Sequence, residues 1–141
     1  MTERPRFHLA FPVRDLAEAR SFYGKLLGCR EGRSADDWVD FDFFGHQIVA
    51  HLIAASPVEH KAHNAVDGED VPVRHFGVIL SRDAWRELAD RLRANSVEFV
   101  IAPQIRFEGE RGEQATFFVN DPSGNALEFK AFADDAMVFA K

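Results

Sequence analysis

Apolar and polar positions follow two periods along the chain, and the same order of periods occurs twice. Residues 7–13 form a short apolar run rich in β-type residues, and residues 74–80 form a second one. A segment with apolar residues at helical spacing follows each run. The histidines of the two runs, His8 and His75, are 67 residues apart. A repeat of this length, present only twice, predicts a pseudo-symmetric domain with two similar halves.

The two predicted helices have recognisable ends. We expect Asp15 to cap the first helix, Glu18 to complete a capping box and Gly28 to end the helix. We expect Asp83 to cap the second helix and Asn95 to end it in a left-handed conformation. The apolar stripes are formed by Leu16, Ala19, Phe22, Tyr23, Leu26 and Leu27 in the first helix, and by Trp85, Leu88, Ala89 and Leu92 in the second.

Strands are predicted after each helix. Residues 39–43 alternate Val and Phe with Asp40 and Asp42, a period of two that predicts a dry face and a wet face. Gly45 turns the chain, and residues 46–53 return as a long strand. In the second half we expect strands at 97–102, 115–120 and 126–132, with the turn sequence DPSGN at 121–125 between the last two.

The predicted fold class is therefore α+β, with two β-α-β-β-β modules in tandem inside a single domain. Module one covers about residues 6–53 and module two about 74–132. The linker at about 54–73 contains Pro57, Gly68 and Pro72 among many polar residues, which predicts an exposed loop. Residues 133–141 form a C-terminal tail.

Composition narrows the class of partner. The net charge of −6 argues against nucleic acid and against an anionic membrane, which both select basic surfaces. The single cysteine, Cys29, excludes an intrachain disulfide and indicates a reducing compartment, where we expect it to pack as a small hydrophobic residue. Neither a signal peptide nor a membrane span is evident. We expect a soluble cytoplasmic protein. Its 14 phenylalanines require a core, a pocket or a subunit interface.

Three residues carry the chemistry of a metal site. His8 and His75 occupy equivalent strand positions, and pseudo-twofold symmetry favours a shared cavity for both imidazoles. Glu128 faces away from Leu127 and Phe129 in the closing strand, and an internal carboxylate there is costly unless it is paired or bound to a cation. Two imidazoles and one carboxylate with open positions form the ligand set of non-haem Fe(II) oxygenases. The same set suits Mn, Ni, Co or Zn.

Two further residues are candidates for the site. His51 lies in the last strand of the first half, as the counterpart of Glu128, and is either a fourth ligand or an acid/base beside the open metal. Arg106 lies in a loop predicted at 103–113, a lid or rim, where it would hold a substrate carboxylate; the alternative is a solvated surface arginine. The remaining histidines, His46, His60 and His63, are expected at the surface.

Three segments resemble the vicinal oxygen chelate superfamily, which includes glyoxalase I, the bleomycin- and fosfomycin-resistance proteins, methylmalonyl-CoA epimerase and the type I extradiol dioxygenases. The segments are FHLAFPVRDL at 7–16, HFGV at 75–78 and DPSGNALEF at 121–129. The resemblance covers nearly the whole chain, and its most diagnostic part is the pattern Asp-Pro-x-Gly-Asn-x-x-Glu. It implies paired βαβββ modules that form an open, U-shaped mixed sheet around one divalent metal, held by His8, His75 and Glu128.

Within that superfamily, residues 40–52 and 126–132 are similar to small bacterial proteins described as predicted extradiol dioxygenases. This similarity implies an Fe(II)-dependent oxidoreductase that cleaves a catechol-type ring with O₂, commonly as a homodimer. Glyoxalase I adds a fourth ligand, at the position where His51 stands. Tyr23 lies on a helical apolar stripe and does not suit the tyrosine that extradiol enzymes place beside their substrate.

Two alternatives and one question stay open. The first alternative is a glyoxalase-like metal-dependent lyase or isomerase, or an antibiotic-modifying transferase. The second is a non-catalytic small-molecule binding protein. The metal site forms either within one chain or across a dimer.

Overall fold

The structure is a computed structural model that describes residues 4–53, 63–66 and 68–141. The chain divides into two compact units. The first contains the described residues up to Ile53 together with Asp121–Asn125, and the second contains those of 63–120 and Ala126–Lys141. The turn at 121–125 therefore belongs to the first unit, although the strands on both sides of it belong to the second.

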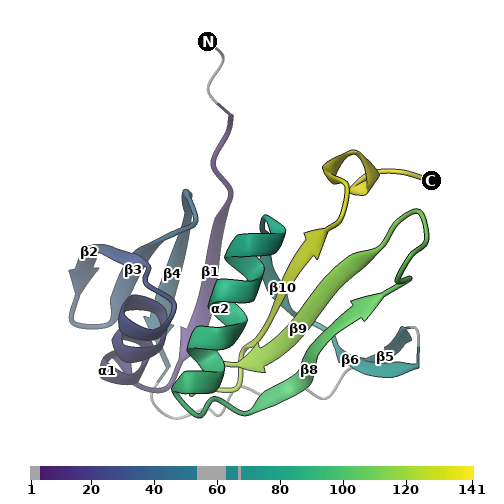
Figure 1. Cartoon of the computed structure of the whole chain (residues 1–141). Helices are drawn as coiled ribbons and strands as arrows, with labels where there is room; N and C mark the ends of the chain where they lie inside the picture. Colours follow the sequence, from purple (N-terminus) through teal and green to yellow (C-terminus); the bar gives the residue numbers. More distant parts are fainter. Residues whose placement is uncertain (1–3, 54–62, 67) are drawn as a thin grey trace. The chain divides into compact units, whose positions relative to one another are not determined.

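The first unit is a four-stranded sheet with one helical segment (Figure 1). The strand order is β1-β4-β3-β2, with β1 parallel to β4 and the other pairs antiparallel. The elements are β1 (His8–Val13), α1 (Leu16–Ala19) continued by the π-helix η1 (Arg20–Leu26), β2 (Arg30–Ala35), β3 (Trp38–Phe43) and β4 (His46–Leu52). The module predicted for the first half of the sequence has this order of elements.

The second unit repeats the plan with the order β7-β10-β9-β8, and here β7 is the parallel edge strand. Its elements are β7 (Phe76–Ile79), α2 (Arg82–Ala94), β8 (Phe99–Arg106), β9 (Gln114–Asn120), β10 (Ala126–Phe132) and the 3₁₀ turn η2 (Asp135–Met137). The predicted α+β class with two β-α-β-β-β modules is confirmed. None of the helices in the described part of the chain is long and apolar enough to span a membrane.

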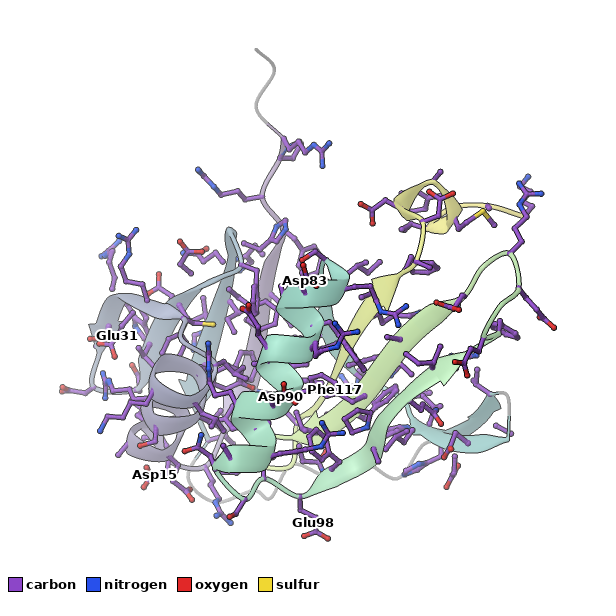
Figure 2. The ribbon with its side chains drawn as sticks, viewed as in Figure 1. Asp15, Glu31, Asp83, Asp90, Glu98 and Phe117 are labelled. Carbon is purple, nitrogen blue, oxygen red and sulfur yellow. The ribbon has the colours of Figure 1, made fainter. Side chains whose placement is uncertain are left out.

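Aromatic side chains form the core between sheet and helix in each unit. In the first unit Tyr23 stacks against Phe11 and Phe41, with ring centroids 5.3 and 5.5 Å away. In the second unit Phe117, labelled in Figure 2, lies 5.7 Å from Trp85 of α2 and is fully buried. Because neighbouring residues of a strand face opposite sides, the polar residues of the same strands lie on the sheet face away from the helix.

The Asp-Pro-Ser-Gly-Asn turn is held by one buried carboxylate. Asp121 accepts four hydrogen bonds of 2.8–2.9 Å, from the Tyr23 hydroxyl, the Asn125 side chain and the backbone N–H groups of Ser123 and Asn125. The Asn125 side chain also donates to the carbonyl of Pro12 in β1. These bonds explain the residue types of the turn and place it in the first unit. They also confirm that Tyr23 is a core residue.

The helix ends agree with the sequence only in part. Asp15 caps α1 as predicted by accepting from the Glu18 N–H, but the Glu18 carboxylate pairs with Arg14, at 2.8 and 2.9 Å, instead of completing a capping box. The cap of α2 is Ser81 and not Asp83, because the Ser81 hydroxyl accepts from Ala84 and Asp83 already lies in the first turn. Asp83 and Asp90 of this helix are labelled in Figure 2.

The predicted end of α2 is also wrong by one residue. Asn95 has a φ of −98°, so it is not left-handed. Ser96, with a φ of 57°, takes that conformation. The Asn95 side chain donates to the carbonyl of Arg91, and the left-handed conformation falls on the next residue, Ser96.

Two predicted loops contain strands. β8 continues through Pro103 to Arg106, and the register between β8 and β9 shifts between Ile101 and Gln104, so the missing N–H of Pro103 falls at an irregular part of the ladder. The predicted linker contains the hairpin of β5 (His63–Val66) and β6 (Glu69–Pro72). Residues 54–62 and 67 of that linker, including His60, lie outside the described residues.

Candidate metal centre

His75 and Glu128 meet on the face of the second sheet that points away from α2. Glu128 lies in β10, and its register partner in β7 is Gly77, two residues after His75. The Nε2 atom of His75 is 3.3 Å from Oε1 of Glu128. The predicted alternation of β10 is confirmed, since Leu127 and Phe129 are fully buried on the helix side.

The other polar atom of each side chain is already engaged. Nδ1 of His75 lies 2.6 Å from the carbonyl oxygen of Pro72, which only accepts, so Nδ1 carries a hydrogen and donates it. Oε2 of Glu128 accepts a 2.6 Å hydrogen bond from the buried hydroxyl of Thr116. The remaining atoms, Nε2 of His75 and Oε1 of Glu128, therefore face each other and form the ion pair.

Burial and hydrogen bonding shift the pKa values of the pair in opposite directions. The hydrogen bond to Glu128 raises the pKa of His75; burial opposes this shift and the Pro72 carbonyl reinforces it. Burial alone would raise the pKa of Glu128, but the hydrogen bonds from His75 and Thr116 outweigh it, so this pKa is lowered. Both shifts favour the charged forms of the two groups, which attract each other across Nε2 and Oε1.

The close approach of β7 and β10 at this point depends on Gly77. A Cβ atom at position 77 would overlap the backbone carbonyl of Glu128. Only glycine lets the two strands come together here, and this approach sets where the Glu128 side chain emerges beside His75. Phe118, the partner of Glu128 in β9, packs edge-on against the His75 ring at 4.9 Å.

His8 lies in the first unit and is oriented by a chain of hydrogen bonds. Its Nδ1 is 2.8 Å from Oε1 of Gln47, the neighbouring residue in β4. Nε2 of Gln47 donates in turn to Oδ2 of Asp40, at 2.9 Å. Asp40 was predicted on a wet face, but it is only 8% exposed. The predicted alternation of β3 is confirmed, since Val39, Phe41 and Phe43 are buried on the helix side. The predicted exposure of Asp40 is wrong, because this residue is covered on the sheet face away from the helix.

A divalent ion is compatible with these donor atoms. Two ligand atoms that each lie about 2.0–2.2 Å from one ion are typically about 3–3.5 Å apart, so the His75–Glu128 separation of 3.3 Å fits two ligands of one metal. In both histidines Nδ1 faces an oxygen atom, of the Pro72 carbonyl in His75 and of the Gln47 side chain in His8, and Nε2 is the atom available to coordinate, as is common in metal-binding imidazoles. In the described part of the chain no group of three His, Cys, Asp or Glu side chains is placed to hold a metal ion. The three-ligand centre stays a prediction, of which the structure brings two members together.

The strand register corrects the position of His51 in the repeat. Glu128 pairs with the residue two places after His75, and the residue that pairs with Ala10, two places after His8, is Val49. Val49 is therefore the counterpart of Glu128, and His51, which pairs with Pro12 and Trp38, is displaced from it by two residues. The offset between the halves is larger in the last strand than in the first, so a single constant offset does not relate the two modules.

The distance along β4 separates His51 from His8. His51 lies on the same sheet face, but it is four residues beyond Gln47, about 13 Å along the strand. Side chains stand roughly perpendicular to a sheet, so the two imidazoles of this unit do not converge on one ion.

The other residues singled out from the sequence, Arg106, Cys29, His46 and His63, have the following contacts. Arg106 ends β8 on the sheet face that carries Glu128, and its guanidinium lies 5.4 Å from the Phe107 ring. Cys29 is buried as predicted, and burial together with the charge of Asp42 raises its pKa to about 12. His46 accepts a hydrogen bond from the Phe7 N–H, and His63 is exposed, with its Nδ1 3.5 Å from Asp70.

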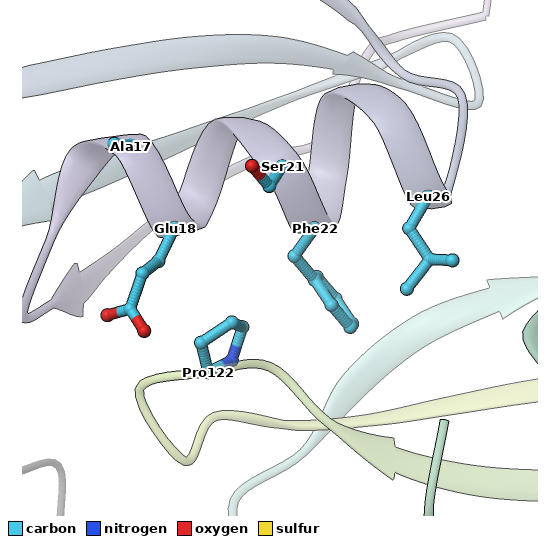
Figure 3. A pocket seen from close by; sticks show the side chains of 6 residues that line it. All are labelled: Ala17, Glu18, Ser21, Phe22, Leu26 and Pro122. Atoms are coloured by element: carbon cyan, nitrogen blue, oxygen red, sulfur yellow. The ribbon is translucent and has the colours of Figure 1, made fainter. Parts of the chain in front are cut away.

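An open hollow runs along α1 and η1 on the side of Pro122 (Figure 3). It is lined mainly by carbon atoms of Ala17, Phe22, Leu26 and Pro122, and it includes none of the predicted ligands. A second hollow, in the other unit, is lined by Phe107, Gln114, Phe132 and Met137 among others, and it also lies away from His75 and Glu128.

Four residues of the site were not found from the sequence: Pro72, Asp40, Gln47 and Thr116. Thr116 is in the predicted strand 115–120, and its alternation with Phe117 was a signal that it faces the same side as Glu128. The link from Asp40 through Gln47 to His8 joins three strands, and no spacing in the sequence indicates that register.

Comparisons with known proteins agree with this architecture. The sequence model of the Glyoxalase/Bleomycin resistance protein/Dioxygenase superfamily matches residues 7–129. A glyoxalase/bleomycin resistance protein/dioxygenase from Alicyclobacillus acidocaldarius is similar over 96% of both chains, with 38% identity and a TM-score of 0.79. The chain belongs to this superfamily, the vicinal oxygen chelate proteins.

More distant structures share the fold. A genomically encoded fosfomycin resistance protein from Listeria monocytogenes is 18% identical, with a TM-score of 0.71 over 97% of this chain and 100% of its own. A lactoylglutathione lyase from Agrobacterium tumefaciens is 16% identical, with a TM-score of 0.62 over 93% and 96%. No protein of curated function matches the sequence. Members of the superfamily are generally metal-dependent enzymes that act on small molecules.

Proposed function

We propose that the protein is an Fe(II)-dependent dioxygenase of the extradiol type, with His8, His75 and Glu128 as the three ligands of one metal ion. The observation that carries the proposal is the donor set itself. A neighbouring residue of the same unit fixes one polar atom of each of the three side chains. The second atoms of His75 and Glu128 face each other at 3.3 Å, where one metal ion would take both. Val49 occupies the counterpart of Glu128 in the first module, and an alkyl side chain cannot coordinate. Three ligands with open positions are typical of non-haem Fe(II) oxygenases.

The chain's own residues supply the rest of the chemistry. His8, His75 and Glu128 would hold the Fe(II), which would supply binding of the catechol oxygens and activation of O₂ for ring opening next to a hydroxyl-bearing carbon. Pro72 and Gln47 hold the two imidazoles in one tautomer, and Thr116 limits Glu128 to a single coordinating oxygen. His51 lies outside this coordination sphere. It acts as an acid or base only on a substrate long enough to reach it along the sheet face. Arg106 would bind a substrate carboxylate at the far end of the second sheet.

The test is activity with iron loaded under anaerobic conditions. Apoprotein reconstituted with Fe(II) and then mixed with O₂ should convert at least one member of a catechol panel to a yellow ring-opened product. Glu128→Gln should abolish that turnover and reduce bound iron well below one equivalent. Stoichiometric iron without any product over a broad panel would contradict the dioxygenase proposal and leave the metal site standing.

The lyase or transferase alternative uses the same three ligands and predicts a different result. Protein loaded with Mn, Ni, Co or Zn would then convert a glutathione hemithioacetal, or would inactivate fosfomycin, while the iron form ignores catechols. Failure of the wild type to bind any divalent metal would instead support a non-catalytic binding protein.

A further inference from the structure

Asp40 is the one buried carboxylate on the polar face of the first sheet among the described residues. It is 8% exposed, and its Oδ2 accepts from the side-chain amide of Gln47. Its other oxygen, Oδ1, is buried and has no hydrogen-bond partner among the described residues. A buried carboxylate with one partner is costly to keep. Its hydrogen bonding is directed at Gln47 alone, which indicates a role in orienting that amide.

The orientation of Gln47 determines the tautomer of His8. A carboxylate only accepts, so the Gln47 NH₂ group must face Asp40 and its carbonyl oxygen must face His8. Nδ1 of His8 then has to donate, which leaves the lone pair of Nε2 for coordination. If the amide were reversed, its NH₂ would face Nδ1, and the hydrogen of a neutral imidazole would move to Nε2.

We propose that Asp40 is a positioning residue that sets the Nδ1–H tautomer of His8 through Gln47. The hydrogen-bond chain crosses three adjacent strands, β3, β4 and β1 (Figure 1). In the strand register Asp40 is diagonal to Gln47, and Gln47 is directly beside His8. In the second module the carbonyl of Pro72 has the same effect on His75. The role of this hydrogen-bond chain in metal binding rests on the proposed function, but its effect on the tautomer of His8 does not.

Asparagine at position 40 separates orientation from packing, because it has nearly the shape of Asp but offers both a donor and an acceptor. In Asp40→Asn the Gln47 amide is no longer held in one orientation, and the Nε2–H form of His8 gains population. The free-energy preference of one neutral hydrogen bond corresponds to a change of about five- to tenfold in the tautomer ratio.

The control is Asp42→Asn. Asp42 lies in the same strand, directly opposite Gln47 in the register, and accepts a 2.7 Å hydrogen bond from the Gly45 N–H. Asparagine retains that acceptor, so this variant removes the same unit of charge without touching the chain from Asp40 to His8.

Long-range ¹H–¹⁵N spectra of the metal-free protein, with the imidazoles neutral and the His8 signals assigned from their loss in His8→Gln, measure the tautomer directly. We expect Nδ1–H to dominate in the wild type and in Asp42→Asn, and Nε2–H to grow in Asp40→Asn. If Asp40→Asn does not fold, Gln47→Met removes the exposed middle residue of the hydrogen-bond chain, and with it the acceptor for His8, and should give the same shift. A wild type with Nε2–H, or folded variants with unchanged tautomers, would overturn the proposal.

Titration with Co(II) provides the second readout. Loss of an outer hydrogen bond to a ligand weakens metal binding by about 10- to 100-fold. The affinity for Co(II) should therefore fall by that factor in Asp40→Asn and stay unchanged in Asp42→Asn. Wild type that has the expected tautomer but binds no cobalt would contradict the proposed metal site and leave the role of Asp40 in orienting His8 intact. Equal affinity in Asp40→Asn and wild type, with cobalt bound, would contradict the role of Asp40 in metal binding.

Discussion

His75 and Glu128 face each other through Nε2 and Oε1, so a proton shared by the two groups and the proposed metal ion would occupy the same place. The two directions of pKa shift follow from this shared site. Because a metal and a proton would compete for Nε2, metal binding at the proposed site would release a proton and would become stronger as the pH rises. In the metal-free protein, the pKa shifts of the same two groups make the stability depend on pH.

The first prediction concerns that dependence. Glu128 has a lowered pKa, so its contribution is present above its usual value of 4.5 and is lost as the pH falls through the lowered pKa. His75 has a raised pKa, so its contribution is present below 6.5 and is lost as the pH rises through the raised pKa. Urea unfolding with a chelator present measures this dependence. Between pH 4.5 and 6.5 the free energy of unfolding of wild type should exceed that of Glu128→Gln by about 1–2 kcal/mol, a range that allows for the partial exposure of His75. A difference that stays constant from acid to alkaline pH would show that the pair is not coupled.

Cys29 should be inert in the native protein. Its pKa of about 12 keeps the thiol protonated at neutral pH, and only the thiolate reacts readily. A disulfide reagent such as DTNB should label Cys29 at least about a hundredfold more slowly in native protein than in denaturant. Labelling at the same rate in both states would mean that the thiol is not buried.

Tyr23 should contribute to stability through its hydroxyl group. Phenylalanine at position 23 preserves the packing against Phe11 and Phe41 but leaves Asp121 without one of its four donors. Loss of a donor to a buried carboxylate should lower the free energy of unfolding by about 1–3 kcal/mol. Urea unfolding of Tyr23→Phe measures this, and a change below about 0.5 kcal/mol would contradict the role given to the hydroxyl.

At the scale of the element, the pairing of β7 with β10 depends on the absence of a side chain at Gly77. Gly77→Ala would place a Cβ against the Glu128 backbone, so β7 must move away from β10 at the level of the proposed ligands. We expect a loss of more than about 2 kcal/mol and weaker metal binding. Gly24→Ala is the matched control, because its Cβ meets only ordinary contacts at 3.8 and 3.9 Å and should be nearly neutral. Equal effects of the two substitutions would argue against the close approach.

The sequence predicts those features of the helices and strands that depend on neighbouring residues, and it does not predict those that depend on strand pairing. Asp15 and the alternation of β10 were predictable because a cap and a strand face depend on residues within a few positions of each other. The exchange of Asp83 for Ser81 shows the limit, since both residues are good caps and the backbone decides between them. The equivalence of Glu128 with Val49 was out of reach, because strand register is set by pairing across the sheet. Asp40 was misjudged for the same reason, since its cover comes from other strands.

At the scale of the whole molecule, the proposed ligands come from both units, His8 from one and His75 and Glu128 from the other. A ligand that binds only the folded protein raises its stability by mass action, by about 2.7 kcal/mol at a free concentration one hundred times the dissociation constant. Thermal unfolding with and without metal therefore reports on the ligands of each unit without any knowledge of the substrate.

We expect Co(II) or Zn(II) at that concentration to raise the midpoint of wild-type unfolding by about 5–10 °C. His8→Ala and His75→Ala should each lose most of that increase, because removal of either imidazole leaves only two of three ligands. His51→Ala should retain it, since His51 lies about 13 Å along β4 from the level of His8. Loss of the increase in His51→Ala would restore His51 as a fourth ligand, and a full increase in His8→Ala would limit the metal site to the second unit.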